Sequence, residues 1–262
     1  MTNKFLSRDE APLEPGTWEL IDGVMIETAK SRLSGRRLLA LEGPYGIGLK
    51  AIPLSDPDSS TGTVISQVMP LALITTGFTL AKRDIAAFES SGTLFDAGPV
   101  AAAALECARR EDDIIFNGFQ KNGVLTAKGH NTLKLSAWNE VGTAANDIIK
   151  AIGMLDSAGF YGPYSLALNP ARYNLLLRRY QNGNISELEH ILTMVTEGVI
   201  KAPALAGGGV LIAAGRQFAS VVLGQDMAVG FVGPTAERLE FTISESLTPY
   251  IRQPEAVCIL ND

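Results

Sequence analysis

The sequence predicts an α+β protein, and three observations lead to this class. The stretch 100–118 is rich in Ala and repeats its apolar residues with helical spacing, which predicts a long helix. The stretch 231–248 alternates apolar and polar residues around Leu239, Phe241 and Ile243, which predicts a strand. Helical and strand-like segments follow one another in a mixed order, without the regular alternation that is typical of a parallel α/β sheet.

Composition describes a well-buried globular chain. The 262 residues, 46% hydrophobic and 19% charged, are enough for one large domain or two small ones. The net charge of −6 and the lack of a basic tract argue against nucleic acid as a partner. Cys107 and Cys258 form no CxxC pair, which fits a reducing compartment. No apolar run has the length of a signal peptide or a membrane span, so we expect a cytoplasmic chain without a membrane partner.

The first long element is a helix that Pro15 and Thr17 open and that continues to about Leu33. Its apolar residues recur at steps of three and four: Trp18, Ile21, Met25, Ala29 and Leu33. On the residues alone, this is a helix packed on the core. Gly35 ends it, 36–42 is predicted to be a strand, and 43–46 a turn.

The central helix, 100–118, has an apolar stripe, with most of its charged residues predicted to lie off it. The stripe contains Val100, Ala104, Cys107, Ala108, Ile114 and Ile115, whereas Arg109, Arg110, Asp112 and Asp113 fall largely outside it. Glu111 lies on the stripe side, where a carboxylate needs a partner. Together with Glu106, these charges are expected to form an ion-pair network rather than an acid–base pair.

The remaining elements are predicted in order as follows. The stretch 50–67 is a long hairpin, 70–80 a strand and 82–89 a short helix. A turn and a strand within 129–135 precede a helix from Ser136 or Asn139 to Leu155, and a strand at 165–168 precedes a helix that Pro170 starts. The stretch 180–185 is a polar turn and 186–197 a helix. The strands 210–215 and 218–224 are expected to pair with each other, and further strands occupy 231–248 and 251–260.

Few residues point to catalysis. The chain has two histidines, His130 and His190, so we expect no metal site, and Glu187-x-x-His190 is a single diiron-like spacing without a second copy. No G-x-S-x-G motif occurs, and Gly207–Gly209 is not followed by the lysine of a phosphate-binding loop. The sequence therefore argues against an enzyme, and no catalytic residue is predicted.

Several segments together resemble one known family. They are LSGRR (33–37), EGPYG (42–46), MPLALITTGFTL (69–80), ARREDDIIFNG (108–118), GFYGPYSLALNPARYNLLL (159–177), GQD (224–226) and PEAVCIL (254–260). In this order they resemble family 1 encapsulin shell proteins, over nearly the whole chain. The resemblance implies the fold of tailed-phage major capsid proteins. Its expected parts are an N-terminal arm and helix (1–45), an extension loop (46–78), a peripheral domain with the long central helix (79–130 and 222–262) and an axial domain (131–221).

The resemblance also implies a function. One chain would assemble into an icosahedral cage, a homo-oligomer that encloses a cargo enzyme of the ferritin-like, haem peroxidase or hemerythrin-like kind, with iron storage as one role. A phage or prophage capsid protein is the first alternative, and a soluble enzyme such as a protease the second. Deletion of 55–62 is expected to weaken assembly more than folding.

Cargo is expected to bind through a C-terminal targeting peptide. By resemblance, Arg36 and Asp226 orient this peptide, and the helix residues Ile21, Met25 and Ala29 form an apolar wall. The alternative is that Arg36 and Asp226 merely pair with other groups. Either Met25→Asp or Asp226→Arg is expected to empty the cage without disassembling it.

Two further expectations follow from the resemblance. The turn formed by Gln181, Asn182, Gly183 and Asn184 aligns with the loop that lines the five-fold pore, with Glu187 as the nearest acid; the alternative is an ordinary surface turn. This loop is uncharged and predicts a polar pore with little charge selection. Some relatives stack flavin on a Trp that FTLAKRDI (78–85) lacks, so we expect no cofactor.

Overall fold

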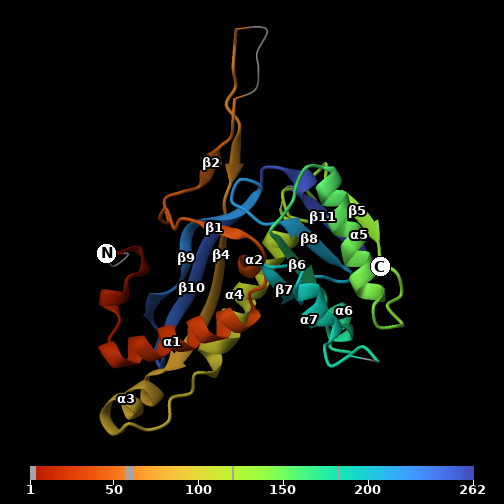
Figure 1. Cartoon of the computed structure of the whole chain (residues 1–262). Helices are drawn as coiled ribbons and strands as arrows, with labels where there is room; N and C mark the ends of the chain where they lie inside the picture. Colours follow the sequence, from red (N-terminus) through yellow and green to blue (C-terminus); the bar gives the residue numbers. More distant parts are fainter. Residues whose placement is uncertain (1–3, 57–61, 120, 182) are drawn as a thin grey trace. The chain divides into compact units, whose positions relative to one another are not determined.

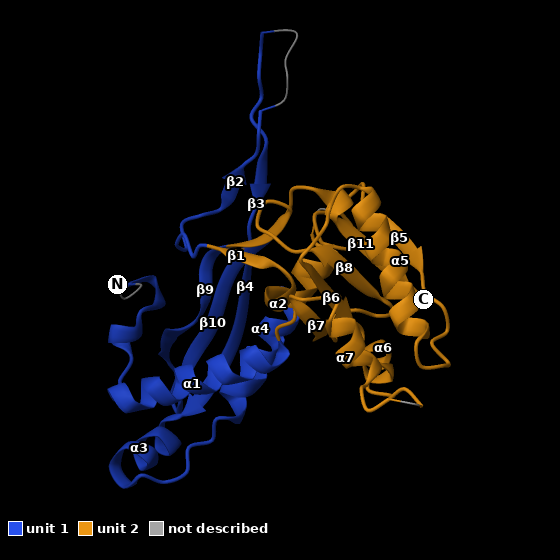
Figure 2. Ribbon diagram, in the orientation of Figure 1, with its two compact units in different colours: residues 1–32, 43–111, 223–248 blue, residues 33–42, 112–222, 249–262 orange. Residues whose placement is uncertain are grey.

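The computed structural model describes residues 4–56, 62–119, 121–181 and 183–262. The chain forms two compact units. The first contains 1–32, 43–111 and 223–248, and the second contains 33–42, 112–222 and 249–262 (Figure 2). This division differs from the four expected parts, because it groups the N-terminal helix, the hairpin and most of the central helix in one unit.

The first unit is built on the strands β4 (Ala72–Ala81), β9 (Ala219–Pro234) and β10 (Arg238–Ile251). β4 and β10 are antiparallel, with Phe78 opposite Phe241. These two rings stack with centroids 5.2 Å apart, and Trp18 of α1 (Pro15–Arg32) meets Phe241 edge-on at 5.8 Å. Thr76 Oγ1 donates to Ala103 O of α4 (Gly98–Asn117) at 3.1 Å. Since Thr76 and Phe78 share a face of β4, α1 and α4 cover the same face of the sheet.

Three shorter pieces complete this unit. The arm before α1 contains two 3₁₀ turns, η1 (Lys4–Leu6) and η2 (Arg8–Glu10), and α3 (Lys82–Ser91) follows β4. The predicted hairpin is confirmed: β2 (Ala51–Pro53) pairs antiparallel with β3 (Val68–Pro70). Figure 1 shows this ribbon leading away from the unit's own sheet.

The second unit contains a five-stranded sheet in the order β5-β11-β8-β6-β7. The strands are β5 (Asn131–Lys134), β6 (Tyr164–Leu168), β7 (Gly198–Lys201), β8 (Gly209–Ala213) and β11 (Val257–Asn261), the last preceded by η3 (Pro254–Ala256). α5 (Thr143–Ser157) packs on one face, and α6 (Pro170–Leu175) and α7 (Glu187–Leu192) follow β6. The core between α5 and the sheet contains Trp138, Ile148, Leu155, Leu166 and Leu211.

The structure corrects four sequence expectations. The stretch 36–42 is not one strand, because a single helical turn, α2 (Gly35–Leu38), precedes the short strand β1 (Ala40–Glu42). β8 does not pair with the following strand but lies between β6 and β11, whereas β9 pairs with β1 and β10. α5 begins later and α7 ends earlier than predicted. β11 pairs with β5 and β8 in the sheet of the second unit, and the expected domain bounds stay a prediction.

The central helix is confirmed as α4, but one acid on it is not where the pattern placed it. Asp112 is fully buried, and its carboxylate accepts hydrogen bonds from Ser34 N, Ser34 Oγ and Gly35 N at 2.7–3.1 Å. These backbone donors belong to the first turn of α2, whose amides have no intrahelical partner. Asp112 therefore caps α2 instead of facing solvent.

Candidate functional site

The α1 stripe is buried within the folded chain. Ile21, Met25 and Ala29 are 0%, 4% and 5% exposed. Such side chains have almost no surface to offer a ligand, which corrects the expectation that they form the wall of a peptide site. The half-buried Leu20 and Val24, on the neighbouring flank of α1, have surface available.

The other flank of α1 is covered by the N-terminal arm. Arg8 makes two hydrogen bonds to the Asp22 carboxylate, at 2.7 and 3.2 Å, and its guanidinium lies 4.0 Å from the centre of the Trp18 ring. A two-fold contact of this kind orients a guanidinium more precisely than a single ion pair does. The arm therefore covers the flank of α1 that contains Trp18 and Asp22, whereas Leu20 and Val24 are half-buried and Ile26 is 43% exposed.

The GQD segment has a separate task for each residue. A side chain at Gly224 would approach Ser246 Oγ to within 2.4 Å, so only glycine fits there. Gln225 is buried, and its amide nitrogen donates to Ser244 O at 3.2 Å and to Ser244 Oγ at 2.8 Å. Asp226 is exposed, and its carboxylate accepts the backbone N–H of Met227 at 2.8 Å. The first two residues thus fix β9 to β10 and present the Asp226 carboxylate at the surface.

Arg36 belongs to the second unit, where it is half-buried in α2. Asp226 belongs to the first unit. The peptide-orienting role of the two residues remains a proposal.

The predicted pore loop is a hairpin turn with a defined base. Arg179 and Ser186 form a β-bridge, and Tyr180 N donates to Ile185 O at 3.3 Å. Tyr180 OH is hydrogen-bonded to His190 Nδ1 at 2.8 Å. The side chains at Gln181 and Asn184 are exposed, as is Gly183, and Asn182 lies outside the described residues. A base of this kind holds a short polar tip in solvent.

Glu187 does not belong to this polar tip, and its expected place in the pore is wrong. The side chain is fully buried, and its Oε1 accepts the N–H groups of Gly142 and Ala145, each at 2.9 Å. These groups lie at the N-terminus of α5, where Gly142 has no side chain with which to cap the helix. Arg178 Nη2 lies 4.0 Å from Glu187 Oε2. Glu187 is a cap that α7 supplies to α5.

Replacing Glu187 with Ala is expected to destabilise the subunit strongly. The change leaves the N–H groups of Gly142 and the buried Ala145, at the N-terminus of α5, without their acceptor, at a cost of about 3 kcal/mol. For a chain of this size, the melting temperature is expected to fall by about 5–10 °C. Thermal unfolding followed by circular dichroism measures this, with Glu140→Ala, at an exposed acid before α5, as the comparison. Equal melting temperatures for the two variants would contradict the capping role.

Asp147 is a buried acid that the sequence analysis missed. Its Oδ2 accepts Ser136 N, Ser136 Oγ and Trp138 Nε1 at 2.7–3.0 Å, and Lys150 donates to Oδ1. Burial by itself raises the pKa of this carboxyl, but the hydrogen bonds from Ser136, Trp138 and Lys150 outweigh it and lower the pKa to about 2. The alternation of polar and apolar residues could not reveal this acid, because its partners are up to 11 residues away in the chain.

Asp147 predicts an acid-dependent loss of stability. A folded-state pKa below the unfolded value means that the stabilisation is fully present above about pH 4 and is lost as the pH falls toward 2. The loss is expected to be on the order of 2 kcal/mol. We expect the melting temperature of the native chain to fall more steeply between pH 4 and pH 2 than that of Asp147→Asn. Parallel pH profiles for the two proteins would rule out this contribution.

The other charged and nucleophilic groups have structural environments. Arg109 and Arg110 both donate to the exposed Glu106, which holds the pKa of that carboxyl near 2. The predicted network is thus confirmed for Glu106 with the two arginines, whereas Asp112, also expected in it, caps α2. Burial raises the pKa of the Cys107 thiol to about 12 and that of Cys258 to about 11, so neither is a reactive thiolate at neutral pH.

The glycine triplet at 207–209 serves close packing. Gly208 N donates to Asp262 Oδ2 at 2.9 Å, and a side chain at Gly209 would lie 2.6 Å from Ala167 O. The N–H that a phosphate-binding loop would need thus faces a carboxylate. Among the described residues, no three His, Cys, Asp or Glu side chains are grouped as metal ligands, and none of the helices has the length and apolarity to cross a membrane.

The hairpin exposes apolar side chains. Ile65 is 79% exposed, and Val64 and Val68 are 48% and 59% exposed. A two-stranded ribbon is only marginally stable by itself, and exposed apolar residues on such a ribbon indicate a surface that a partner covers.

Comparison with known proteins decides the family. The family model described as "Encapsulating protein for peroxidase" matches residues 2–248. The chain belongs to this encapsulin family. It is 30% identical to the type 1 encapsulin shell protein EncA of Myxococcus xanthus, covering 98% of this chain and 96% of that protein. It is 31% identical to the type 1 encapsulin shell protein of Rhodococcus erythropolis, covering 99% of this chain and 100% of that protein.

Solved structures confirm the capsid-like fold. The encapsulin chain superposes on the virus-like particle protein of Pyrococcus furiosus with a TM-score of 0.76 and 22% identity, over 93% of this chain and 99% of the other. It also matches the capsid protein of Myoviridae phage XM1 with a TM-score of 0.57 and 12% identity, over 86% and 90% of the two chains. Family membership favours a structural shell protein over the predicted alternative of a soluble enzyme.

Proposed function

We propose that this encapsulin chain assembles into a closed icosahedral compartment that encloses a cargo protein, with a peroxidase as the first cargo to test. The match of the encapsulating-protein family to residues 2–248 carries the proposal. Obligate interfaces of about 2,000 Å² or more, repeated by symmetry, make assembly of such a cage effectively permanent. The exposed apolar residues of the β2–β3 hairpin support a role for this arm in contact between copies.

Cargo is proposed to dock through its C-terminal targeting peptide. Asp226 at the surface of β9 and Arg36 in α2 are the charged groups proposed to orient this peptide. Leu20 and Val24 replace the buried stripe of α1 as the proposed apolar contacts. Because each peptide buries only a few side chains, its affinity is modest and becomes effective when an oligomeric cargo carries many copies.

The exchange of small molecules is proposed to occur through the loop 181–184. Its uncharged composition favours a polar pore with weak charge selection, and the burial of Glu187 removes the expected cation preference. The compartment is proposed to lie in the cytoplasm, in keeping with the two free cysteines, and its net charge of −6 argues against packaged nucleic acid.

Electron microscopy of the chain purified without partners tests the proposal. We expect closed particles of one or two sizes, and particles filled with protein after co-expression with a cargo gene. A stable monomer or dimer at micromolar concentration would overturn the proposed assembly. Closed particles filled with DNA would favour a phage capsid protein instead.

A further inference from the structure

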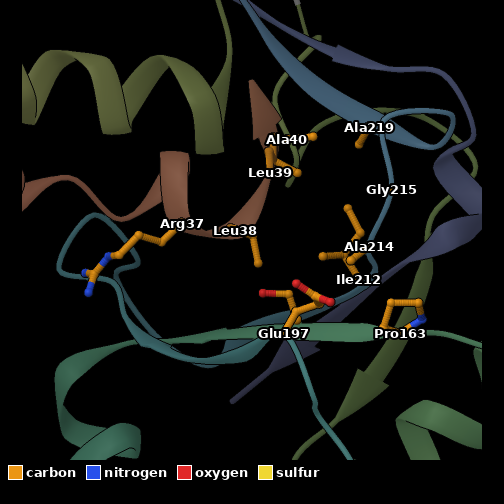
Figure 3. A pocket seen from close by; sticks show the side chains of 11 residues that line it. Arg37, Leu38, Leu39, Ala40, Pro163, Glu197, Ile212, Ala214, Gly215 and Ala219 are labelled. Carbon is orange, nitrogen blue, oxygen red and sulfur yellow. The ribbon is translucent and has the colours of Figure 1, made fainter. Parts of the chain in front are cut away.

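A pocket of about 380 Å³ lies within the second unit (Figure 3). Tyr164, Leu166 and Leu168 of β6 belong to the core under α5, so the intervening Ser165 points to the opposite face of the sheet. α2 packs against β6. The pocket is lined by Arg37, Leu38, Leu39, Ala40, Pro163, Ser165, Glu197, Ile212, Ala214, Gly215 and Ala219.

Strand register explains why this space is empty of side chains. Ser165 is paired with Gly198 of β7 on one side and with Ile212 of β8 on the other. Gly198 contributes no side chain, and no atom of the described residues lies within 4 Å of the position that its Cβ would occupy. The residues Ala40, Ala214 and Ala219 are also small, so the walls stay apart.

Two polar side chains face the pocket. Ser165 is 1% exposed, and among the described residues its hydroxyl has no hydrogen-bond partner. Glu197 also lines the pocket and is exposed to solvent, and its backbone is held next to β6 because Glu197 N donates to Tyr164 O at 3.0 Å. Figure 3 shows the Glu197 side chain reaching into the pocket. Buried hydroxyl groups normally have partners, so an unpartnered one in a pocket that a carboxylate also lines indicates a ligand.

The electrostatics favour a cation. Arg37 lies at the rim, but its Nε donates to Leu33 O at 3.0 Å, and Figure 3 shows its side chain directed away from the pocket. The charge that the pocket presents is therefore the carboxylate of Glu197. The apolar walls around it come from Leu38, Leu39 and Ile212.

We propose that this pocket binds a primary ammonium group carried on a short aliphatic chain. The ammonium group would pair with the Glu197 carboxylate and donate one N–H to Ser165 Oγ, while the methylene groups lie along Leu38 and Ile212. The volume is at the small end of ligand pockets and has room for a short alkyl chain, for which a chain of about five carbons is a suitable probe. Such a group is present both in free alkylamines and in the lysine side chain of a second copy of this chain.

Calorimetric titration of the purified, assembled protein with n-pentylamine at pH 7 tests the first source, with n-pentanol as the uncharged counterpart. Saturable binding of the amine, and none of the alcohol, is expected. Glu197→Gln should weaken amine binding at least tenfold, and Ala214→Leu should block it by filling the pocket. Glu19→Gln, at an exposed position on α1, should bind as the native chain does.

Ser165→Ala separates a ligand contact from a structural one. We expect amine binding to weaken several-fold while the melting temperature stays equal or rises, because the hydroxyl has no partner in the folded chain. A clearly lower melting temperature would overturn its assignment as a ligand group.

The second source is tested by zero-length carbodiimide cross-linking of assembled particles followed by mass spectrometry. A link between Glu197 and a lysine of another copy supports the same chemistry with the chain itself as ligand. Absence of both amine binding and this cross-link overturns the proposal, as does amine binding that Glu197→Gln leaves unchanged.

Discussion

Deletion of 55–62 is expected to abolish closed particles while leaving the subunit folded. The deleted segment includes 57–61, which lies outside the described residues, and the paired strands β2 and β3 lie outside the deletion. The shortened connection between β2 and β3 is expected to deprive Val64 and Ile65 of their proposed contact with another copy. Light scattering and electron microscopy measure the loss of particles, and circular dichroism measures the fold.

Two point variants distinguish the effect on assembly of losing an apolar contact from the effect of adding a charge. Ile65→Asp removes an apolar side chain that is 79% exposed and is expected to reduce particle yield at least tenfold. Ser66→Asp introduces the same charge at the next residue and keeps Ile65, so a much smaller loss is expected. Full particle yield from both the deletion and Ile65→Asp would show that the arm is not an assembly contact.

Asp226→Arg is expected to empty the compartment without preventing its assembly. The residue is exposed, and Gly224 and Gln225 hold its strand, so the substitution leaves the packing of β9 on β10 intact. Reversing its charge removes the carboxylate proposed to orient the targeting peptide, and cargo content should fall at least tenfold. Gel analysis of particles purified after co-expression with cargo measures the ratio of cargo to shell protein.

Glu237→Arg is the matched control, because it reverses an exposed acid on the same β9–β10 hairpin and should load cargo fully. Met25→Asp, in contrast, does not test docking. Its side chain is 4% exposed, so an aspartate there would place a charge in the core and is expected to prevent folding. Full loading of Asp226→Arg particles would place the peptide site elsewhere.

Much of this molecule was predictable from local patterns in the sequence. The helices at 15–32 and 98–117 follow from apolar residues at helical spacing, and the β2–β3 hairpin follows from a polar, turn-rich segment between β-prone ends. These signals depend on neighbours within a few residues, where backbone geometry is set by the side chains themselves. The family, and with it the capsid-like fold, followed from short segments in a characteristic order.

Only the tertiary structure decided which face of each element is covered and by what. Asp112 and Glu187 look like surface acids in the sequence, yet both are buried caps of helices that begin 78 and 42–45 residues away. The α1 stripe could serve the core or a ligand, and its burial assigns it to the core. The pocket beside Ser165 exists because Ser165 of β6 is paired with a glycine, Gly198 of β7, which contributes no side chain. Such long-range pairings depend on the free energy of the whole fold, which no local periodicity contains.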